Sequence, residues 1–589
     1  MPPRIPIADL RGLRPSDLAR DAAAAAAVTV LGIPQGIAYA MIAGLPPAMG
    51  LYASIAPTII GSLARSSRHV ITGPTNALSL LVGGAIAAMS DDPATVAITL
   101  ALLVGVMQTL AGFLRLGVVV DYISSPVVRG YITGAGVLIG AGQLHNITRT
   151  VKPDGGGGTL FATIRGWIDV VQGGVHLPSL GLALAMIGLI VAIRWLRSSW
   201  PSEIIAMVLS IVATVALGLR EHGVLTIADI APIPSGLPPL TIPDPALVVT
   251  LLPVAVACTV LSLVESSSVA RAIASRTGQR LDASAEFAGQ GLANIAAAFT
   301  GGYPTSGSLS RSAINEQAGG RTRLSGVMAG LMTVVVVLLL SPTLNNTPIA
   351  GLAGLLLVVA WDLVDVPRIR KVMATRYADQ AAFLATLIGT WVLDLDKAIY
   401  LGVGISLVLF LQRARMLVIR EMAFGPRGRL RDLVGRIPSQ FRRCGRMRIL
   451  HAEGALFFGS SGELRDALDE AASEEGVEVV LIRLKRTQGM DVTTIEALEA
   501  VAVAMRQRGQ RLVLAGLRAR PMERIERSGA IEILGETNIF PTRLRWFQAM
   551  DDAIRDIQQH VTPCEGGCED CPMLDYLADV DEKEASRDQ

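Results

Sequence analysis

Charged residues are scarce in this chain of 589 residues: Asp, Glu, Lys and Arg make up 17% of it, and aromatic residues only 4%. Two long stretches, residues 221–270 and 324–367, contain no Lys or Arg. A soluble enzyme of this length would carry more charge and would lack such long stretches without a basic residue. The composition therefore excludes an ordinary soluble enzyme, and we expect no nucleic-acid partner and no cofactor.

Cysteine is also rare, with five residues in the whole chain, three of them close to the C-terminus. Such a set is no disulfide framework, because a framework needs paired cysteines spread through a small domain. We therefore expect the soluble parts of the chain to face a reducing compartment.

Hydrophobic residues are abundant instead, at 51%, with a mean hydropathy of +0.48. The many Gly, Ala, Leu and Val residues suit closely packed membrane helices. We predict an all-α polytopic membrane domain of about 14 segments. The segments that start at 76 and 306 look too short to span a membrane alone. The apolar stretches begin near residues 22, 48, 76, 94, 120, 177, 203, 246, 285, 306, 324, 346, 379 and 397.

Arginine predicts the orientation of these segments through the positive-inside rule. If the N-terminus is cytoplasmic, nearly all basic loops fall on the cytoplasmic side, and the opposite loops are almost bare. The exception is a Gly-rich loop around Arg149, Lys152 and Arg165. We predict a multi-pass protein of the inner (plasma) membrane with both termini in the cytoplasm. The cytoplasmic basic residues are Arg65, Arg68, Arg115, Arg194, Arg197, Arg271, Arg276, Arg280, Arg321, Arg323, Arg368, Arg370 and Lys371, followed by Arg413, Arg415 and Arg420 after the last segment.

Two short polar breaks interrupt the apolar segments: TGPTNALS (Thr72–Ser79) and YPTSGSLSRS (Tyr303–Ser312). Proline favours the first turn of a helix, so each break predicts a short helix that starts within the membrane with unpaired N–H groups. Two such starts in corresponding halves indicate a transporter's substrate site, and their partial positive charge suits an anion. An odd number of segments in each half makes the halves inverted. The alternative is a pair of ordinary proline kinks.

Polar side chains in two other apolar segments are candidates to complete this site. Gln35 and Tyr39 lie four residues apart and so share one helix face, where they line the site or bond to neighbouring helices. Glu265 is the only acidic residue in its long apolar stretch. Because hydrocarbon disfavours an anionic carboxylate, we expect a proton carrier, with a fixed structural hydrogen bond as the alternative. Ser266, Ser267 and Ser268 follow it, as hydrogen-bond partners or part of a cation site.

Arg311 comes five residues after Ser306 on the helix predicted at the second break. It either adds positive potential behind the anion site or marks the cytoplasmic end of that helix.

Three long motifs resemble the SulP anion-transporter family, also called solute carrier family 26. They are IPQGIAYAMIAGLPPAMGLYAS, TGPTNALSLLVG and GQGLANIAAAFTGGYPTSGSLSRSAINEQAGGRT. The resemblance implies core and gate domains built as a seven-plus-seven inverted repeat, elevator-like motion, a homodimer and an anion bound between the third and tenth helices. It implies backbone contacts near Thr75, Asn76 and Ala77, and near Ser306, Gly307 and Ser308, with Gln35 and Tyr39 lining the pocket. A bulky residue at Gly307 would then block it.

The resemblance also places Glu265 at the family's ion-coupling position. In the sodium-coupled bicarbonate members of the family that it resembles, this position looks like Asp, with Thr one turn later. This chain has Glu265 and Val269 at the two positions. The departure favours a proton over sodium as the coupling ion.

Beyond about residue 435 the pattern changes to alternating apolar strands and charged helices, which predicts a small α/β domain. It resembles the STAS domain, a module of sulfate transporters and anti-sigma antagonists. In MDVTTIEAL, Asp491, Thr493 and Thr494 stand where antagonists carry a phosphorylatable Ser. Thr493 or Thr494 is predicted to cap the following helix, with a regulatory phosphosite as the alternative. A cytoplasmic protein partner would bind through this domain.

The C-terminal CEGGCEDCP places Cys564, Cys568 and Cys571 in C-x3-C-x2-C spacing. A zinc site would need a fourth ligand, from His451, His560, Cys444 or another chain, so we favour a redox-sensitive tail without metal. The expected domains are a cytoplasmic segment (1–20), the transporter (21–420), a linker (421–436), the STAS domain (437–560) and a disordered tail (561–589).

These features together predict a secondary-active transporter, not an enzyme, that moves a small anion such as sulfate, bicarbonate or a small carboxylate with a proton. The alternatives are sodium-coupled bicarbonate uptake, a nucleobase permease, and a sensor or channel with vestigial transport.

Overall fold

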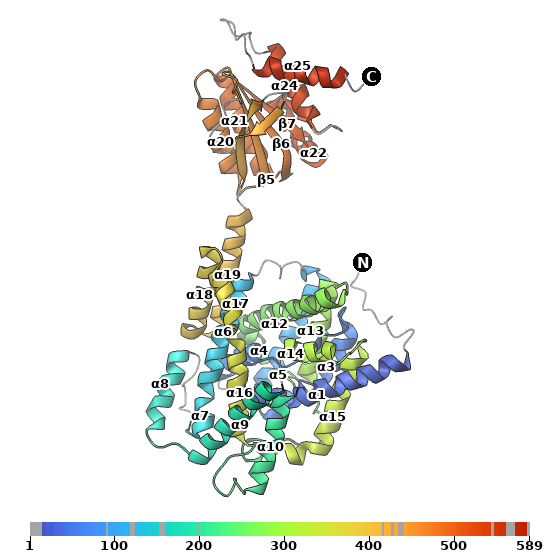
Figure 1. The fold of residues 1–589 in the computed structure, drawn as a ribbon, viewed down its shortest axis with the longest axis vertical. Helices are drawn as coiled ribbons and strands as arrows, with labels where there is room; N and C mark the ends of the chain where they lie inside the picture. Colours follow the sequence, from blue (N-terminus) through green and yellow to red (C-terminus); the bar gives the residue numbers. More distant parts are fainter. Residues whose placement is uncertain are drawn as a thin grey trace. The chain divides into compact units, whose positions relative to one another are not determined.

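The computed structural model describes residues 14–89, 92–117, 124–151, 159–197, 200–414, 417–425, 429–433, 441–543, 547–560 and 572–585. The chain divides into two compact units, Met1–Leu407 and Val408–Gln589. The first is almost entirely helical, and the second is a mixed α/β unit (Figure 1). This order confirms the prediction of a helical membrane domain followed by a small α/β domain.

Each of the 14 predicted apolar segments coincides with a helix or, at the two polar breaks, with a short strand followed by a helix. The α-helices of the first unit are α1 (Pro15–Ile42), α2 (Pro47–Tyr52), α3 (Ala56–Ala64), α4 (Asn76–Ala87), α5 (Pro93–Phe113), α6 (Ser125–Gly142), α7 (Leu144–Thr148), α8 (Leu160–Val171), α9 (Leu177–Leu196), α10 (Ser202–Ala216), α11 (Ile227–Ile230), α12 (Val248–Thr277), α13 (Ala283–Phe299), α14 (Leu309–Gln317), α15 (Leu324–Leu344), α16 (Ile349–Leu363), α17 (Val366–Met373) and α18 (Tyr377–Val392). Helix α19 (Leu395–Ala414) begins in this unit and ends in the second.

Within the described residues, eight helical segments are long and apolar enough to cross a membrane, fewer than the 14 predicted. The other predicted segments coincide with α4, α6, α10, α13, α14 and α18, which are shorter or more polar. Helix α14, for example, carries Ser, Arg, Asn and Glu within nine residues. Three of its polar residues, Arg311, Ser312 and Asn315, are buried against protein, where lipid does not reach them.

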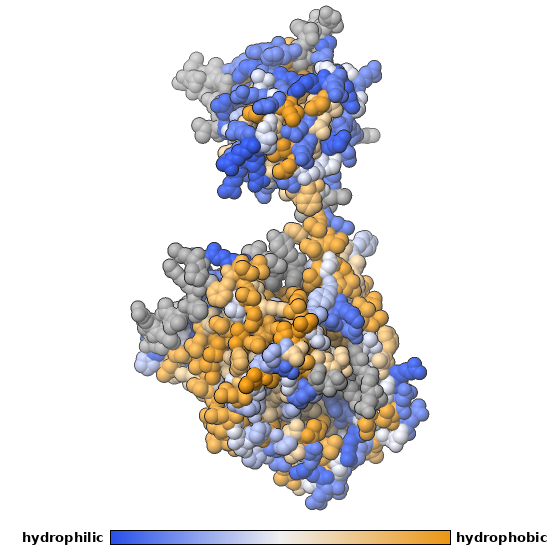
Figure 2. Space-filling view, turned by 180° about the vertical axis from the view of Figure 1, so that it is seen from behind, coloured by the Kyte–Doolittle hydropathy of each residue, from blue (hydrophilic) through white to orange (hydrophobic). Residues whose placement is uncertain are grey.

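The helices of this unit pack in two groups that both draw on early and late parts of the chain. In one group α13 packs on α3 and α5, and α1 packs on α14 and α15. In the other group α16 packs on α6 and α9, and α18 packs on α6. Apolar side chains cover much of the visible surface of the unit (Figure 2), and α9 and α15 expose Leu184, Val191, Val335 and Leu339. Such an apolar surface fits a lipid environment.

The second unit contains a six-stranded sheet of order β4-β3-β5-β6-β7-β8, in which β5 to β8 are parallel and β3 and β4 antiparallel. Alternation along β6 sends Val480 and Ile482 to one face of the sheet, in a core shared with α20 and α21, and Val479 and Leu481 to the other, in a core shared with α24 and α25. The elements are β3 (Val418–Gly425), β4 (Arg429–Asp432), β5 (Met447–Leu456), α20 (Ser461–Ser473), β6 (Val479–Gly489), α21 (Val492–Gln507), β7 (Arg511–Leu517), α22 (Ala519–Ser528), α23 (Ala530–Leu534), β8 (Ile539–Pro541), α24 (Gln548–His560) and α25 (Pro572–Ala585).

Several predicted boundaries differ from these elements. Residues 421–436, expected to be a linker, contribute to β3 and β4, whose backbone groups pair with β5 and with each other. In the tail expected to be disordered, residues 572–585 form α25, because Met573, Tyr576 and Leu577 give it an apolar face that packs into the core. Helix α1 already begins at Pro15, within the predicted N-terminal segment. Lys152 and the Gly-rich run of the exceptional loop lie outside the described residues, whereas Arg165 is on helix α8.

Candidate functional site

The two polar breaks meet as a short antiparallel ribbon inside the membrane unit. Strand β1 (Ile71–Gly73) pairs with β2 (Ser306–Ser308), with Thr72 opposite Gly307. Helix α4 follows β1 after Pro74 and Thr75, and helix α14 follows β2 directly. Because the strands are antiparallel, the two helices leave the ribbon from opposite ends. The breaks are therefore true chain interruptions and not proline kinks.

Helix α13 holds the chain just before β2 through two buried amide side chains. Asn294 accepts a hydrogen bond from the Thr305 N–H at 2.7 Å and donates one to the Thr305 carbonyl at 3.1 Å. Gln290 donates to the same carbonyl at 2.8 Å. Both side chains are fully buried, so they satisfy backbone groups that water cannot reach.

Helix α12 fastens β2 from another side with two serines. Ser262 donates to the Thr305 carbonyl at 3.0 Å and its own carbonyl accepts from Ser306 Oγ at 3.1 Å. Ser266 Oγ accepts the Gly307 N–H at 2.8 Å and donates to Gln290 at 3.1 Å. Ser266 is thus committed to the ribbon, which corrects its predicted role as a partner of Glu265 or part of a cation site.

Glu265 projects from the same stretch of α12 towards the start of α4. Its Oε2 accepts a hydrogen bond from Thr75 Oγ1 at 3.0 Å, and the Ser306 hydroxyl lies within hydrogen-bonding reach. Thr75 is the N-cap residue of α4, yet its side chain does not cap that helix. Glu265 is only half-buried. The carboxylate therefore touches both broken segments while remaining accessible.

The two helix starts differ in detail from the prediction. In α4, the Asn76 side chain accepts the N–H of Ala77 at 2.8 Å. Helix α14 begins at Leu309, because Ser306–Ser308 are extended, and Ser308 Oγ accepts the Arg311 N–H at 3.5 Å. The N–H of Gly307 is used by Ser266, and a Cβ at Gly307 would lie 3.0 Å from Ser266. Gly307 therefore faces α12, and the expected blocking of the anion by a bulky residue there does not follow.

Gln35 and Tyr39 of α1 are buried beside the start of α14. Gln35 Oε1 accepts a hydrogen bond from Ser310 Oγ at 3.4 Å, and Ser310 itself is exposed. Tyr39 lies close enough to Arg311 and Glu265 to interact electrostatically with both. The residues predicted to share one face of α1 therefore adjoin the junction of the two helix starts.

Arg311 is buried, with 2% of its surface exposed, in the first turn of α14. Its Nη1 donates to Ser54 Oγ at 3.1 Å and its Nη2 to the Gly32 carbonyl at 3.2 Å. Within the described part of the chain no carboxylate pairs with it, and its buried Nε has no partner. Arg311 is therefore a buried residue at the start of α14.

Sequence reasoning missed Gln290, Asn294 and Ser262, whose common partner, Thr305, is 11 to 43 residues away on another element. The only available signal was their polarity within helices that are otherwise rich in Ala, Gly and Leu.

In the C-terminal unit the predicted cap lies two or three residues too late in the chain. Asp491, not Thr493 or Thr494, caps α21: its Oδ1 accepts the Thr494 N–H at 2.9 Å and the Thr494 hydroxyl at 2.8 Å. Burial alone would raise the pKa of Asp491, but these bonds and the Phe458 N–H hold that pKa below its ordinary value. Thr494 is fully buried and Thr493 exposed, so only Thr493 stays a candidate regulatory site.

Of the predicted weak metal site, only the possible fourth ligands, Cys444, His451 and His560, lie among the described residues. Cys564, Cys568 and Cys571 lie outside the described residues. Cys444 and His451 are buried, and His451 Nδ1 lies 2.9 Å from Asp432. His560 is largely exposed at the end of α24. Asp432 and Glu453 flank His451, but Arg420 and Arg486 pair with these carboxylates, so the cluster is an ion-pair network.

Comparison with known proteins identifies the family. The model described as the sulfate permease family matches residues 18–386, and that of the STAS domain matches residues 440–544. The chain belongs to the sulfate permease family. It is 31% identical over 534 residues to a protein named probable sulfate transporter from Mycobacterium tuberculosis, covering 89% of this chain and 93% of that one. It is 27% identical to the chloroplastic sulfate transporter 4.1 of Arabidopsis thaliana, covering 92% and 80%.

Solved structures agree on the fold of this sulfate permease family member. The structure of SLC26A9 superposes with a TM-score of 0.85 at 19% identity, covering 94% of this chain and 92% of that one. The transmembrane domain of the cyanobacterial bicarbonate transporter BicA gives a TM-score of 0.60 at 24% identity, covering 67% and 99%. Family membership confirms a transporter, not an enzyme.

The first prediction concerns Gly73, at the end of β1. A Cβ there would lie 2.3 Å from Arg311 Nη1, so Gly73→Ala should displace the guanidinium and lower anion uptake about tenfold, the value of one charged hydrogen bond. Uptake into proteoliposomes measures this. Gly84→Ala on α4 is the control, because its Cβ would make an ordinary contact of 3.5 Å with Leu395; equal uptake by both variants would contradict the account.

The second prediction concerns the cap of α21. Asp491→Ala should destabilise that helix by about 1 kcal/mol at neutral pH, and amide hydrogen exchange of α21 in the full-length protein measures the change. Because the native state depresses this pKa, the stabilisation is present above the unfolded-state pKa of Asp and is lost as the pH falls through the native value. Thr493→Ala, at an exposed neighbour, should leave exchange unchanged; an equal effect would refute the cap.

Proposed function

We propose that this protein is a secondary-active transporter of a small anion, bound between the starts of α4 and α14 and coupled to a proton through Glu265. The observation that carries the proposal is the buried Arg311, whose charge no described carboxylate balances, in the first turn of one of two helices that start from the same ribbon. A buried charge without a counter-charge is costly, and a bound anion would supply one.

The starts of α4 and α14 and the charge of Arg311 would all attract an anion. The first N–H groups of a helix have no partner within it and carry the positive end of the helix dipole. Because α4 and α14 start from paired strands, both positive ends face one region, as in transporters with broken helices. Contacts from Thr75, Asn76, Ala77 and Ser308, and from the accessible first turn of α14, would bind the ligand, with Gln35 and Tyr39 at its side.

The packing supports an elevator-like mechanism in an inverted repeat of seven plus seven segments. Hydrogen bonds join β1, β2, α12, α13 and α14 into one body, which would be the core. Helices α6, α9, α16 and α18 pack on one another and would be the gate. Each group takes its helices from both halves of the chain, as the repeat requires.

A proton suits the coupling site better than sodium. Val269, one turn after Glu265 on α12, is buried among apolar side chains and offers no oxygen ligand. Glu265 bonds to a hydroxyl and is half-buried, so it can lose and regain a proton as access alternates.

Sulfate is the first substrate to test, because the relatives named above are named sulfate transporters. Bicarbonate is the second, because BicA is described as a bicarbonate transporter; a small carboxylate is the third. Backbone N–H groups select for charge and size more than identity. We further propose a homodimer and a cytoplasmic partner of the STAS domain.

The third prediction is that Glu265→Gln abolishes proton-driven accumulation but leaves anion binding largely intact, because the amide preserves the hydrogen bond and cannot titrate. Proteoliposome uptake of labelled sulfate, bicarbonate and fumarate under imposed proton or sodium gradients measures it. Asp362→Asn, at a half-exposed carboxylate paired with Arg194, is the control. Undiminished proton-dependent uptake by Glu265→Gln would refute the coupling role, and flux driven by sodium alone would favour the sodium alternative.

The fourth prediction is that Arg311→Gln weakens anion binding about tenfold or more, since a charged donor is lost from a buried position. Equilibrium binding of labelled sulfate to the purified protein measures it. Arg276→Gln removes an exposed arginine paired with Glu316 and should leave binding unchanged. Equal affinity in the two variants would contradict an electrostatic role for Arg311.

A further inference from the structure

Another buried arginine of the membrane unit, Arg65, directly follows helix α3. The sequence assigns it to a cytoplasmic loop, yet none of its surface is exposed. Its side chain lies against α13 over Gly289, where a Cβ would lie 2.8 Å from Arg65 Cγ. The missing side chain of Gly289 therefore leaves the space that the arginine occupies.

A column of polar side chains on α13 lies beside Arg65. Glu286, Gln290 and Asn294 follow one another at intervals of four residues, so they share one face of the helix over about 12 Å of its length. All three are buried. Gln290 and Asn294 both donate to the carbonyl of Thr305, the residue before β2. The column therefore joins the start of α13 to the ribbon.

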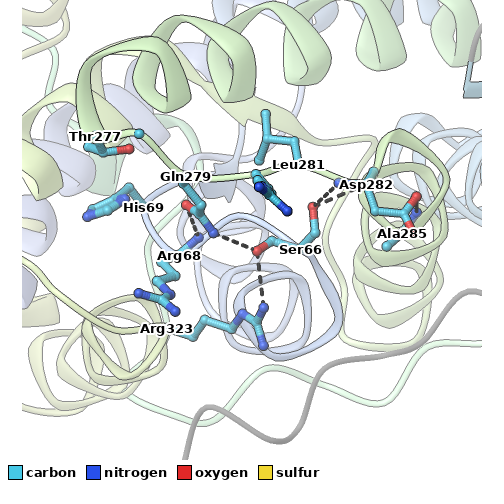
Figure 3. A pocket seen from close by; sticks show the side chains of 11 residues that line it. Ser66, Arg68, His69, Thr277, Gln279, Leu281, Asp282, Ala285 and Arg323 are labelled. Carbon is cyan, nitrogen blue, oxygen red and sulfur yellow. Dashed lines mark hydrogen bonds between the residues drawn. The ribbon is translucent and has the colours of Figure 1, made fainter.

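Glu286 fixes the end of the column that lies away from the ribbon. Its Oε1 accepts the Ser66 hydroxyl at 2.6 Å. Figure 3 shows Ser66 in the lining of a pocket of about 650 Å³, with dashed lines to Gln279 and Asp282 on the α12–α13 connection. The other oxygen, Oε2, lies 3.8 Å from Arg65 Nη1. The two buried charges therefore balance each other.

Arg65 determines which way the Gln290 amide faces. Its Nη2 donates to Gln290 Oε1, the one hydrogen bond of this side chain among the described residues. A guanidinium has donors only, so it requires the oxygen of the amide and not the NH2 group. The same oxygen accepts from Ser266 at 3.1 Å, and the NH2 group donates to the Thr305 carbonyl at 2.8 Å. A turned amide would place donor against donor and carbonyl against carbonyl.

We propose that Arg65 is a positioning residue for the anion site, acting through Gln290. With the amide held in one orientation, Gln290 bonds to Thr305 while Ser266 accepts the Gly307 N–H. These bonds fix β2 and, with it, the first turn of α14. Because a guanidinium has no acceptor and stays protonated, the column cannot relay a proton and acts as a support. The inference rests on the function proposed above, since it needs an anion at that turn.

The test measures uptake of labelled sulfate by full-length protein in proteoliposomes, with the double variant Arg65→Met/Glu286→Gln. Removal of both charges leaves no lone buried ion, whereas Gln290 loses the donor that orients it. We expect the KM for sulfate to rise about tenfold, the value of one charged hydrogen bond, with the maximal rate per folded transporter nearly unchanged. Arg65→Lys keeps a charged donor and should restore most of the affinity.

Arg276→Met/Glu316→Gln is the matched control. It removes a partly exposed ion pair of 2.8 Å towards the ends of α12 and α14, away from the ribbon, and should leave KM unchanged. A raised KM in the Arg65 double variant, restored by lysine, supports the positioning role. An unchanged KM overturns it. So does a lower maximal rate without a change in KM, which a merely structural role would produce.

Amide hydrogen exchange of residues 305–309 is measured alongside and needs no substrate. The double variant should exchange faster in this segment than wild type, and Arg65→Lys should resemble wild type. Equal exchange in wild type and double variant overturns the inference. A wild type that takes up no anion would instead refute the proposed function, while the exchange result would still decide whether Arg65 orders β2.

Discussion

The pairing of β1 with β2 is the constraint on which the rest of the membrane unit depends. Extended backbone at membrane depth exposes N–H and C=O groups that lipid cannot satisfy. Each strand supplies partners for the other, and buried side chains satisfy what remains: Thr58 bonds to Thr72, Ser312 to Ile71, and Asn294 to Thr305. A consequence of this solution is that two helix starts from distant parts of the sequence must lie beside one another.

The same ribbon organises the charges around it. Arg311 reaches beneath β1 because Gly73 has no side chain, and Glu265 reaches the start of α4 because Ser262 and Ser266 anchor α12 to β2. One positive and one negative group thus approach the junction from different helices, and neither is paired with the other by hydrogen bond or ion pair among the described residues. In the function proposed here, an anion would balance the first and a proton would neutralise the second.

Much of this could be predicted from the sequence, because the 14 helical segments and the two proline-led breaks follow from local composition and proline stereochemistry. The ribbon itself could not, since strands of three residues are too short for a period-2 pattern. For that reason Ser306–Ser308 were expected at a helix start, while Gln290 and Asn294, which act through distant partners, were not recognised. Strands β3 and β4 were missed in the predicted linker because the pairing of β3 with β5 is non-local. Helix α25 was missed because its few apolar residues form a recognisable face only where they pack against the sheet.

The central claim is that one anion binds between the starts of α4 and α14. The most direct measurement is a structure of the full-length protein with selenate, which matches sulfate in shape and charge and whose selenium scatters X-rays anomalously. The account predicts one anomalous peak within hydrogen-bonding distance of the first turns of both helices, close to Ser310 and Thr75. A selenate found elsewhere, with no peak at the junction under conditions in which sulfate is transported, would contradict it.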